Sequence, residues 1–319
     1  MNILIIRLSS FGDIVQAMAV NKKIKQKYPE ATIHWLTKPA FAKVVALDPL
    51  SDKVISVQKS YISQFKSLLK QNQYDYVYDA HQSIRSKLMR LASLFGKEKW
   101  IIRPKGRLKR WLLFSWRKNL FPDPFIGRMS YISPLKEIGI SGGYEKTSWN
   151  FVDETNYTDS IVFAPSAAWE MKRWPIKYWK ELIQQVIQTG KQVILLGGPS
   201  DTFIEELVLD SNLVINLAGK TSLIESCDIV AKARFVVSAD TGIIHVADAL
   251  GVSGVLLNGP TAFGKTHGPQ IKILESNLAC MPCSKDGRGN CSQEVYQQCM
   301  VDLTPEKVFS VLKPFIEHP

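Results

Sequence analysis

The sequence predicts an α/β protein made of two consecutive doubly wound domains. Three observations carry this prediction. Short apolar strand patterns alternate with helical patterns, the alternation occurs in two separate series, and each series is roughly 150 residues long, the size of an ordinary domain. The length of 319 residues and the apolar content of 45% suit a globular protein of this size. No run of about eighteen uncharged apolar residues occurs, so no segment is expected to span a membrane.

The first series occupies the N-terminal half. Its strands are predicted at residues 3–6, 32–36, 54–57 and 74–79, and its first helix at 14–27. Strands that alternate with helices pair in parallel, so we expect one sheet with helices on both faces. The opening residues, MNILIIRLSS, have no basic segment before the apolar run and no cleavage site after it. They indicate a buried first strand and not an export signal, and the protein is expected to stay in the cytoplasm.

The second series begins at residue 161. Its strands are predicted at 161–164, 192–196, 235–238 and 254–257, and its helices at 176–189, 222–233 and 242–250. The polar stretch 141–160 is the expected linker. Ligands of such folds bind beyond the carboxyl ends of the strands, so motifs that follow strands are the candidates for a site.

These patterns divide the chain into three parts. We expect an N-terminal domain at residues 1–155, a C-terminal domain at 156–300, and a final helix at 301–319 that packs back on the N-terminal domain.

Positive charge is concentrated in one stretch. Forty Lys and Arg residues against 29 Asp and Glu give a net charge of +11, and from Arg85 to Lys118 there are twelve basic residues and one acidic residue, Glu98. Such a local field suits an anionic partner: a phosphorylated glycolipid, an acidic membrane surface or a nucleic acid. A solvated basic face without a specific partner is the alternative.

The first candidate motif, RLSSFGD at residues 7–13, directly follows the first strand. Gly12 permits a close backbone approach, and Asp13 lies at the start of a helix. A carboxylate in that position is what a general base for a hydroxyl group requires. The alternative is a first-turn carboxylate that only caps the helix.

Two further motifs follow strands of the second series. In APSAAWEMKRWP, residues 164–175, small residues let backbone amides approach an anion, and Lys172 supplies a point charge. In SADTGIIH, residues 238–245, a strand is followed directly by a helix whose first N–H groups can bind a diphosphate. Neither GxGxxG after the first strand nor GxxxxGK[ST] occurs, which weakens an oxidoreductase or NTPase interpretation.

Four of the five cysteines crowd into one stretch: Cys280, Cys283, Cys291 and Cys299. In a cytosolic chain such clustering is more often metal or redox chemistry than a structural disulfide. A structural Zn or Fe site with four sulfur ligands, free thiols and redox-labile pairs all stay open.

Taken together, LSSFGDI, KRWP and SADTGIIHVADALGV followed by GPT resemble the ADP-heptose:lipopolysaccharide heptosyltransferases of glycosyltransferase family 9. With DAHQSIRS at residues 79–86, the resemblance extends over nearly the whole chain. It implies a GT-B fold, in which two Rossmann-like domains face a central cleft. It also implies an inverting transfer of heptose from ADP-heptose to a lipid A–Kdo or heptosylated inner-core acceptor of lipopolysaccharide, with no cofactor required for catalysis.

The resemblance also implies roles for individual residues. Asp13 is similar to the family's catalytic carboxylate. The residues expected to bind the donor are Ser166, Ala167, Lys172, Asp201, Asp240, Thr241, Gly242 and His245. Because this chain has Ala167 and Ala168 where some members carry hydroxyls, phosphate contacts in that loop must come from backbone amides.

The basic stretch is expected to hold the phosphates and acidic sugars of the acceptor. The residues assigned to this role are Arg85, Arg103, Lys105, Arg107, Lys109 and Arg110. The same charge is expected to place the protein on the cytoplasmic face of the inner membrane.

Two other functions stay open. A protein could be the acceptor of the same donor sugar. The other is a non-catalytic nucleotide- or nucleic-acid-binding protein, which only the positive charge favours. No recognisable nucleic-acid motif occurs and Asp13 argues for catalysis, so no nucleic acid is expected as a partner.

Overall fold

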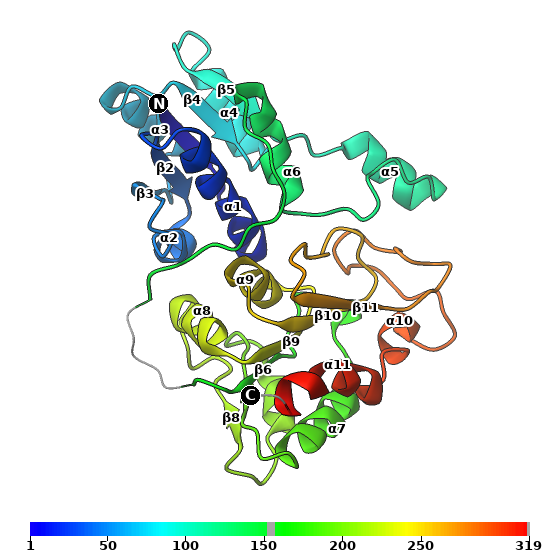
Figure 1. The fold of residues 1–319 in the computed structure, drawn as a ribbon. Coiled ribbons are helices and arrows are strands. Elements are labelled where there is room, and N and C mark those ends of the chain that lie inside the picture. Colours follow the sequence, from blue (N-terminus) through cyan, green and yellow to red (C-terminus); the bar gives the residue numbers. More distant parts are fainter. Residues whose placement is uncertain (152–156, 318–319) are drawn as a thin grey trace. The chain divides into compact units, whose positions relative to one another are not determined.

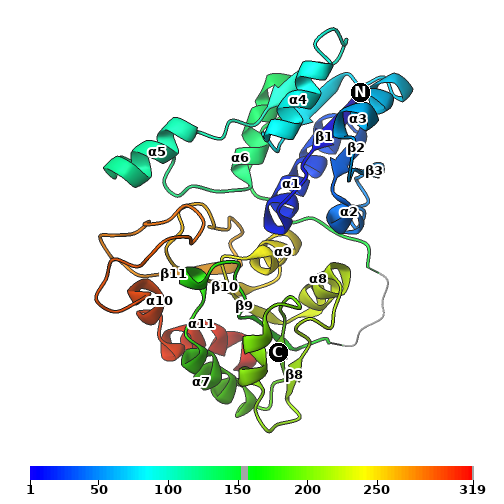
Figure 2. The same cartoon turned by 180° about the vertical axis from the view of Figure 1, so that it is seen from behind.

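The structure, a computed structural model, describes residues 1–151 and 157–317 and divides into two compact units. The N-terminal domain comprises Met1–Gly106 and Arg128–Phe151, and the C-terminal domain comprises Arg107–Gly127 and Val152–Pro319. Each is a parallel sheet with helices on both faces (Figures 1 and 2), which confirms the predicted fold class. The expected domain boundary after residue 155 and part of the expected linker lie outside the described residues.

The N-terminal domain has a five-stranded sheet in the order β3-β2-β1-β4-β5. Its strands are β1 (Asn2–Ile6), β2 (Thr32–Thr37), β3 (Lys53–Ser56), β4 (Tyr76–Asp79) and β5 (Lys99–Ile102). Its helices are α1 (Phe11–Lys27), α2 (Pro39–Val45), α3 (Tyr61–Gln71), α4 (Ile84–Ala92), α6 (Met129–Ile132) and the 3-10 helix η1 (Ser133–Ile138). On β1, Leu4 and Ile6 pack in one cluster with Phe65 of α3 and Met89 of α4. Successive strand residues point to opposite faces, so this cluster lies on one side of the sheet.

The C-terminal domain has a six-stranded sheet in the order β11-β10-β9-β6-β7-β8. Its strands are β6 (Ile161–Ala164), β7 (Val193–Leu195), β8 (Val214–Asn216), β9 (Phe235–Ala239), β10 (Gly254–Asn258) and β11 (Ile271–Glu275). Its helices are α5 (Arg107–Trp116), α7 (Ile176–Ile187), α8 (Leu223–Lys232), α9 (Gly242–Leu250), α10 (Gln298–Val301), α11 (Pro305–Glu317) and the 3-10 helices η2 (Glu170–Lys172) and η3 (Thr202–Leu207).

The final helix corrects an expectation. The sequence placed it on the N-terminal domain, but α11 contacts α7 and β10 of the C-terminal domain. Its residues Val308 and Leu312 are buried in one cluster with Trp179 of α7 and Phe235 of β9. The physical reason is that the apolar face of this sheet extends beyond the reach of α7, and α11 covers the rest.

Residues 107–127 also differ from expectation. The sequence assigned them to the N-terminal domain, whereas the structure groups them with the C-terminal domain. Three of their aromatic side chains, Phe114, Phe121 and Phe125, lie edge-on to Phe263, with ring centroids 4.9 to 6.2 Å away. This aromatic cluster attaches the segment to the C-terminal domain.

The order of the strands locates the place where each sheet binds ligands. In both sheets the first strand of the domain has strands on either side, and the chain crosses from one side to the other between β3 and β4 and between β8 and β9. Doubly wound folds bind ligands beyond the carboxyl ends of the strands at this reversal. The reversal lies between β1 and β4 in the N-terminal domain and between β6 and β9 in the C-terminal domain.

Candidate active site

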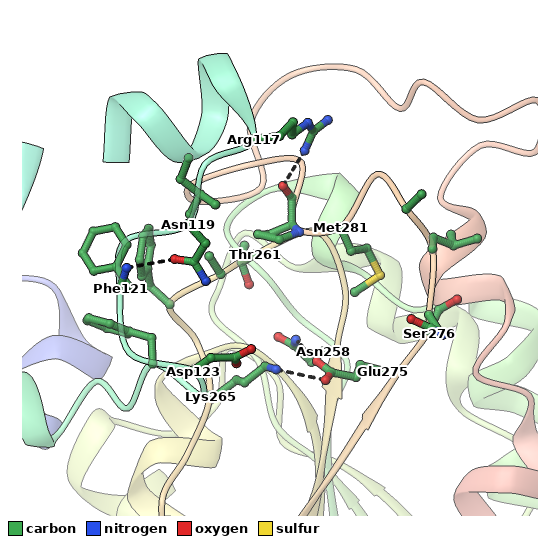
Figure 3. A pocket seen from close by; sticks show the side chains of 18 of the residues that line it. Arg117, Asn119, Phe121, Asp123, Asn258, Thr261, Lys265, Glu275, Ser276 and Met281 are labelled. Atoms are coloured by element: carbon green, nitrogen blue, oxygen red, sulfur yellow. Dashed lines mark hydrogen bonds and ion pairs between the residues drawn. The ribbon is translucent and has the colours of Figure 1, made fainter. Parts of the chain in front are cut away.

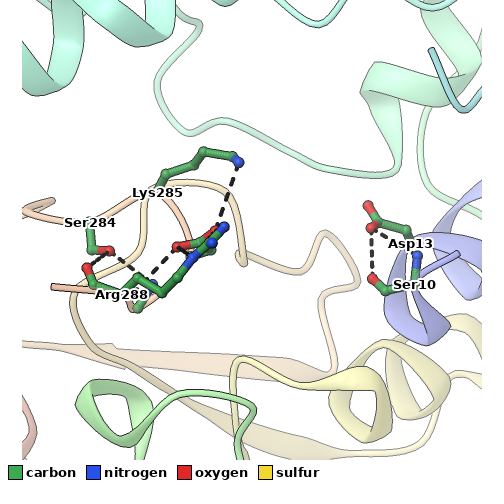
Figure 4. A network of polar contacts seen from close by, with 7 residues as sticks. Ser10, Asp13, Ser284, Lys285 and Arg288 are labelled. Carbon is green, nitrogen blue, oxygen red and sulfur yellow. Dashed lines mark hydrogen bonds and ion pairs between the residues drawn. The ribbon is translucent and has the colours of Figure 1, made fainter. Parts of the chain in front are cut away.

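Asp13 stands at the reversal point of the N-terminal sheet, in the first turn of α1 beyond β1. Arg7 Nη2 lies 2.6 Å from Asp13 Oδ2. The Ser10 hydroxyl donates to the same oxygen at 2.8 Å (Figure 4), and the Tyr131 hydroxyl donates to Oδ1 at 2.8 Å. Both carboxylate oxygens are therefore held in place, yet the side chain is still 39% exposed.

The surroundings keep Asp13 ionised at neutral pH. Burial acts to raise the pKa of this carboxyl, but the Arg7 guanidinium and the hydrogen bonds from Ser10 and Tyr131 outweigh it. The net result is a pKa well below the usual range for Asp. An oriented, ionised and partly exposed carboxylate can accept a proton from a substrate hydroxyl. The capping alternative is also present in the geometry, because the Ser10 backbone N–H donates to Asp13 Oδ2 at 3.4 Å.

Three residues that the sequence did not assign to the site surround Asp13. Arg7 is buried, and its Nη1 donates to the carbonyl of Ala80 at 2.8 Å, which ties the end of β1 to the loop after β4. Tyr131 comes from α6, 118 residues further along the chain, so no local pattern indicates it. Burial, aided by the Arg7 charge, lowers the pKa of His81 to about 4, and the ring is therefore neutral at pH 7.

Arg103, one of the predicted acceptor residues, lies among the residues that surround Asp13. Its Nε and Nη2 donate to the Ser130 hydroxyl at 3.1 and 2.6 Å, and its guanidinium lies 3.9 Å from the centre of the Tyr131 ring. The residue is 7% exposed. Its charge acts on Asp13 and lowers the pKa of that carboxyl.

The other predicted acceptor residues are divided between the domains. Arg85, which stacks on Tyr61 at 5.0 Å, and Lys105 lie in the N-terminal domain. Arg107, Lys109 and Arg110 lie on α5 in the C-terminal domain. The basic stretch is thus continuous in sequence but is not a surface of one domain.

In the C-terminal domain the predicted donor residues meet at the second reversal point. Lys172 follows β6, Asp240 follows the neighbouring strand β9, and Lys172 Nζ lies 2.8 Å from Asp240 Oδ2. Thr261 donates to the same oxygen at 2.9 Å, and His245 Nε2 lies 3.6 Å from Oδ1. Burial acts to raise the pKa of Asp240, but the charge of Lys172 and the contact with His245 prevail and lower it.

The N-terminus of α9 adds backbone donors to this cluster. Thr241 caps the helix and Gly242 begins it, so the first N–H groups of α9 are adjacent to Lys172 and Asp240. His245, one turn later, is 4% exposed, and its Nδ1 has no hydrogen-bond partner in the part of the chain that is described. A cation beside a helix N-terminus is a site for a diphosphate and for the charge that develops on it as a leaving group.

The remaining predicted donor residues form a second cluster between the loops after β6 and β7. The Ser166 hydroxyl and the Gly198 N–H donate to Asp201 Oδ2 at 2.6 and 2.7 Å. Arg173, which the sequence did not assign, donates to the carbonyl of Ala167 at 3.1 Å, and its Nη2 lies 3.9 Å from Asp201 Oδ1. Asp201 therefore holds the two loops together through both of its oxygens.

For the cysteine stretch, the sequence left a metal site, free thiols and redox-labile pairs open. In the described residues, 1–151 and 157–317, no group of three or more His, Cys, Asp or Glu is placed so that it could hold a metal ion. All five cysteines are free. Cys299 is buried, and burial together with the neighbouring thiols raises its pKa to about 12.

Comparison with known proteins adds to this geometry. A family model described as glycosyltransferase family 9 (heptosyltransferase) matches residues 133–294. The chain is 26% identical to lipooligosaccharide heptosyltransferase 2 of Haemophilus ducreyi over 99% of both chains. The solved structure of Escherichia coli ADP-heptose LPS heptosyltransferase II is similar with a TM-score of 0.70 and 22% identity, covering 99% of both chains. E. coli heptosyltransferase WaaC with ADP-2-deoxy-2-fluoro heptose gives a TM-score of 0.68 and 20% identity, covering 98% of this chain and 99% of that one.

Proposed function

Because the chain belongs to glycosyltransferase family 9, we propose that it transfers a heptosyl group from ADP-heptose to the inner core of lipopolysaccharide. The names of its relatives support this donor and this acceptor, and the two Rossmann-type domains are the fold of those relatives. The observation that carries the proposal is the cluster of Lys172, Asp240 and His245 at the N-terminus of α9.

The donor diphosphate binds at this cluster. Lys172 and the N–H groups that follow Thr241 contact the phosphates, and the unpartnered Nδ1 of His245 is available to the donor. As the bond between the anomeric carbon and the phosphate oxygen breaks, these groups stabilise the charge that collects on ADP. Lys172 and the helix N-terminus supply this stabilisation, so the reaction requires no metal ion.

The acceptor hydroxyl reacts under the control of Asp13. Its oxygen attacks the anomeric carbon from the face opposite to the departing ADP, so the anomeric configuration inverts. Its proton passes to the Asp13 carboxylate, which Arg7, Ser10 and Tyr131 hold ionised and oriented. The residues Arg85 and Lys105 of the N-terminal domain bind the anionic groups of the acceptor.

The protein works at the cytoplasmic face of the inner membrane. No helix within the described part of the chain has the length and apolarity to cross a bilayer. Helix α4 instead exposes large apolar side chains: Ile84 is 77% exposed, Leu91 is 62% exposed and the following Phe95 is fully exposed. Lys87 and Arg90 lie on the same helix, and an exposed apolar stripe with basic flanks suits an anionic lipid surface.

The test is an assay of ADP release with purified protein, ADP-heptose and inner-core acceptors of increasing length. We expect ADP release that depends on the acceptor, together with a mass increase of the acceptor by one heptose. ADP-glucose and UDP-glucose serve as control donors. Transfer from either control donor at the rate seen with ADP-heptose, or ADP release that does not depend on the acceptor, contradicts the proposal.

A further inference from the structure

The C-terminal domain contains a cavity beside the donor cluster. It has a volume of about 490 Å³, within the range of about 300–1,000 Å³ that small-molecule sites occupy. Its inner wall is formed by the ends of β10 and β11 and its outer wall by residues 117–125, as Figure 3 shows. Lys172, Asp240 and His245 are not among its lining residues, but Thr261 is, and the Thr261 hydroxyl donates to Asp240 at 2.9 Å. The cavity therefore adjoins the donor cluster without belonging to it.

One polar group in this cavity is left without a partner. Asn258, the last residue of β10, is 1% exposed, and its Nδ2 donates to Glu275 Oε2 at 2.8 Å. Its carbonyl oxygen, Oδ1, has no hydrogen-bond partner within the described residues. A buried acceptor left unsatisfied destabilises the fold, so a ligand group that donates to Asn258 Oδ1 would bind favourably.

The rest of the lining combines aromatic rings with basic side chains that already have partners. Phe121, Phe125 and Phe263 pack edge to face, with ring centroids 4.9 to 5.4 Å apart. The two basic side chains are both engaged: Lys265 lies 2.9 Å from Glu275 Oε1, and Arg117 donates to the carbonyls of Cys280 and Pro282 at 2.9 and 2.8 Å.

The charged residues of this lining indicate which ligand charge the cavity favours. The carboxylates of Asp123 and Glu275 face an anionic ligand unfavourably, since the lining cations Lys265 and Arg117 already have partners. Apolar rings and convergent amide and carboxylate oxygens instead suit an uncharged molecule with many hydroxyl groups and apolar C–H faces.

We propose that this cavity binds an uncharged sugar ring of the acceptor saccharide, which makes Asn258 a specificity-determining residue. The inference rests on the proposed function. An acceptor sugar fits better than the donor sugar because the proposed donor site is the separate cluster of Lys172, Asp240 and His245, and none of these residues lines the cavity.

The experiment uses two variants and one control. Asn258→Ala removes the unpartnered oxygen. Ala279→Trp fills the cavity from an exposed lining position, so its effect does not depend on a change in the core. Val208→Trp introduces the same side chain at a position of the same domain that is 44% exposed and does not line the cavity. Melting curves establish that each variant is folded.

Two acceptors are compared, one that ends in an acidic sugar and one that carries an uncharged heptose beyond it. With the second acceptor we expect KM to rise about tenfold or more in Asn258→Ala and Ala279→Trp, the effect of losing one well-formed buried contact. KM for ADP-heptose, KM for the acidic acceptor and all constants of Val208→Trp stay at wild-type values. Unchanged KM for the heptosylated acceptor overturns the inference, and a raised KM for ADP-heptose assigns the cavity to the donor.

A binding measurement separates this inference from the proposed function. Ligand-observed NMR with a methyl mannoside tests for binding of an uncharged sugar without turnover, and a methyl glucuronide serves as the anionic comparison. We expect saturation transfer to the mannoside in the wild type and its loss in Ala279→Trp. If no donor is turned over but the mannoside binds in this way, the proposed function fails and the sugar site stands. If the mannoside does not bind, or Ala279→Trp binds it as the wild type does, the sugar site fails.

Discussion

Replacing Lys172 by Met separates the two roles that the structure gives this residue. Lys172 forms an ion pair with the buried carboxylate of Asp240, and in our proposal it also binds the donor diphosphate. The first role concerns the stability of the fold and the second concerns affinity for ADP. A second substitution, Asp240→Asn, removes the need for the first role and leaves the second unchanged.

The loss of stability follows from the burial of the pair. The side chains of Lys172 and Asp240 are 12% and 14% exposed, and their charged atoms are 2.8 Å apart. Removing one partner of a buried pair costs about 3–5 kcal/mol. Because Thr261 and His245 still contact Asp240, we expect a loss of about 3 kcal/mol, which lowers the melting temperature by about 6–12 °C for a domain of this size. Lys172→Met combined with Asp240→Asn has no unpaired charge and recovers most of this loss.

Affinity for ADP behaves differently. Loss of a charged hydrogen bond to phosphate weakens binding about 10- to 100-fold, and this loss persists when Lys172→Met is introduced into the Asp240→Asn background. Thermal unfolding measures the first effect, and calorimetric titration with ADP of the single and double variants measures the second. Equal ADP affinity in Asp240→Asn and the double variant would refute the donor role of Lys172. An unchanged melting temperature in Lys172→Met would refute the account of the buried pair.

Three further predictions concern the reaction. Asp13→Asn lowers kcat by about 10²- to 10⁴-fold and leaves ADP affinity unchanged, as titration and turnover assays measure; near-full turnover would leave Asp13 as a helix cap only. Arg7 lowers the pKa of Asp13, and Asp13 must be ionised to act as the base, so Arg7→Gln moves the acid limb of the kcat/KM profile to higher pH. The wild type keeps its activity from pH 7 down to about pH 5. Coincident pH profiles of the two proteins contradict this prediction. Activity persists in EDTA, because Lys172 and the N-terminus of α9 supply the positive charge at the donor; a loss that Mg²⁺ restores contradicts it.

The strands that the sequence analysis missed share one property. β5, β8 and β11 were not predicted, and each lies at the edge of its sheet. An edge strand is half solvated, so charged residues such as Lys99 in β5 and Lys272 in β11 interrupt the apolar pattern from which a strand is predicted. The central strands, buried on both faces, have uninterrupted apolar runs and were found at nearly the observed positions.

Whether a residue of the candidate site could be chosen from the sequence likewise depends on how local its surroundings are. Asp13, Lys172 and Asp240 could be chosen from sequence because each directly follows a buried strand, and the carboxyl ends of parallel strands share one edge. Tyr131 could not be chosen, and Arg103 was chosen only as an acceptor residue, because their place beside Asp13 depends on contacts across more than one hundred and about ninety residues of chain.

What the sequence determined by itself is therefore local: the alternation of strands and helices, the turn after each central strand, and the polar residue types that those turns carry. What only the tertiary structure decided is which distant groups meet. It placed α11 in the C-terminal core, moved residues 107–127 onto the C-terminal domain, and left Asn258 with an unpartnered oxygen beside an aromatic cluster. The reason is that periodicity records which face of an element is buried, whereas the identity of the covering element depends on the order of the strands and on packing, which no local pattern encodes.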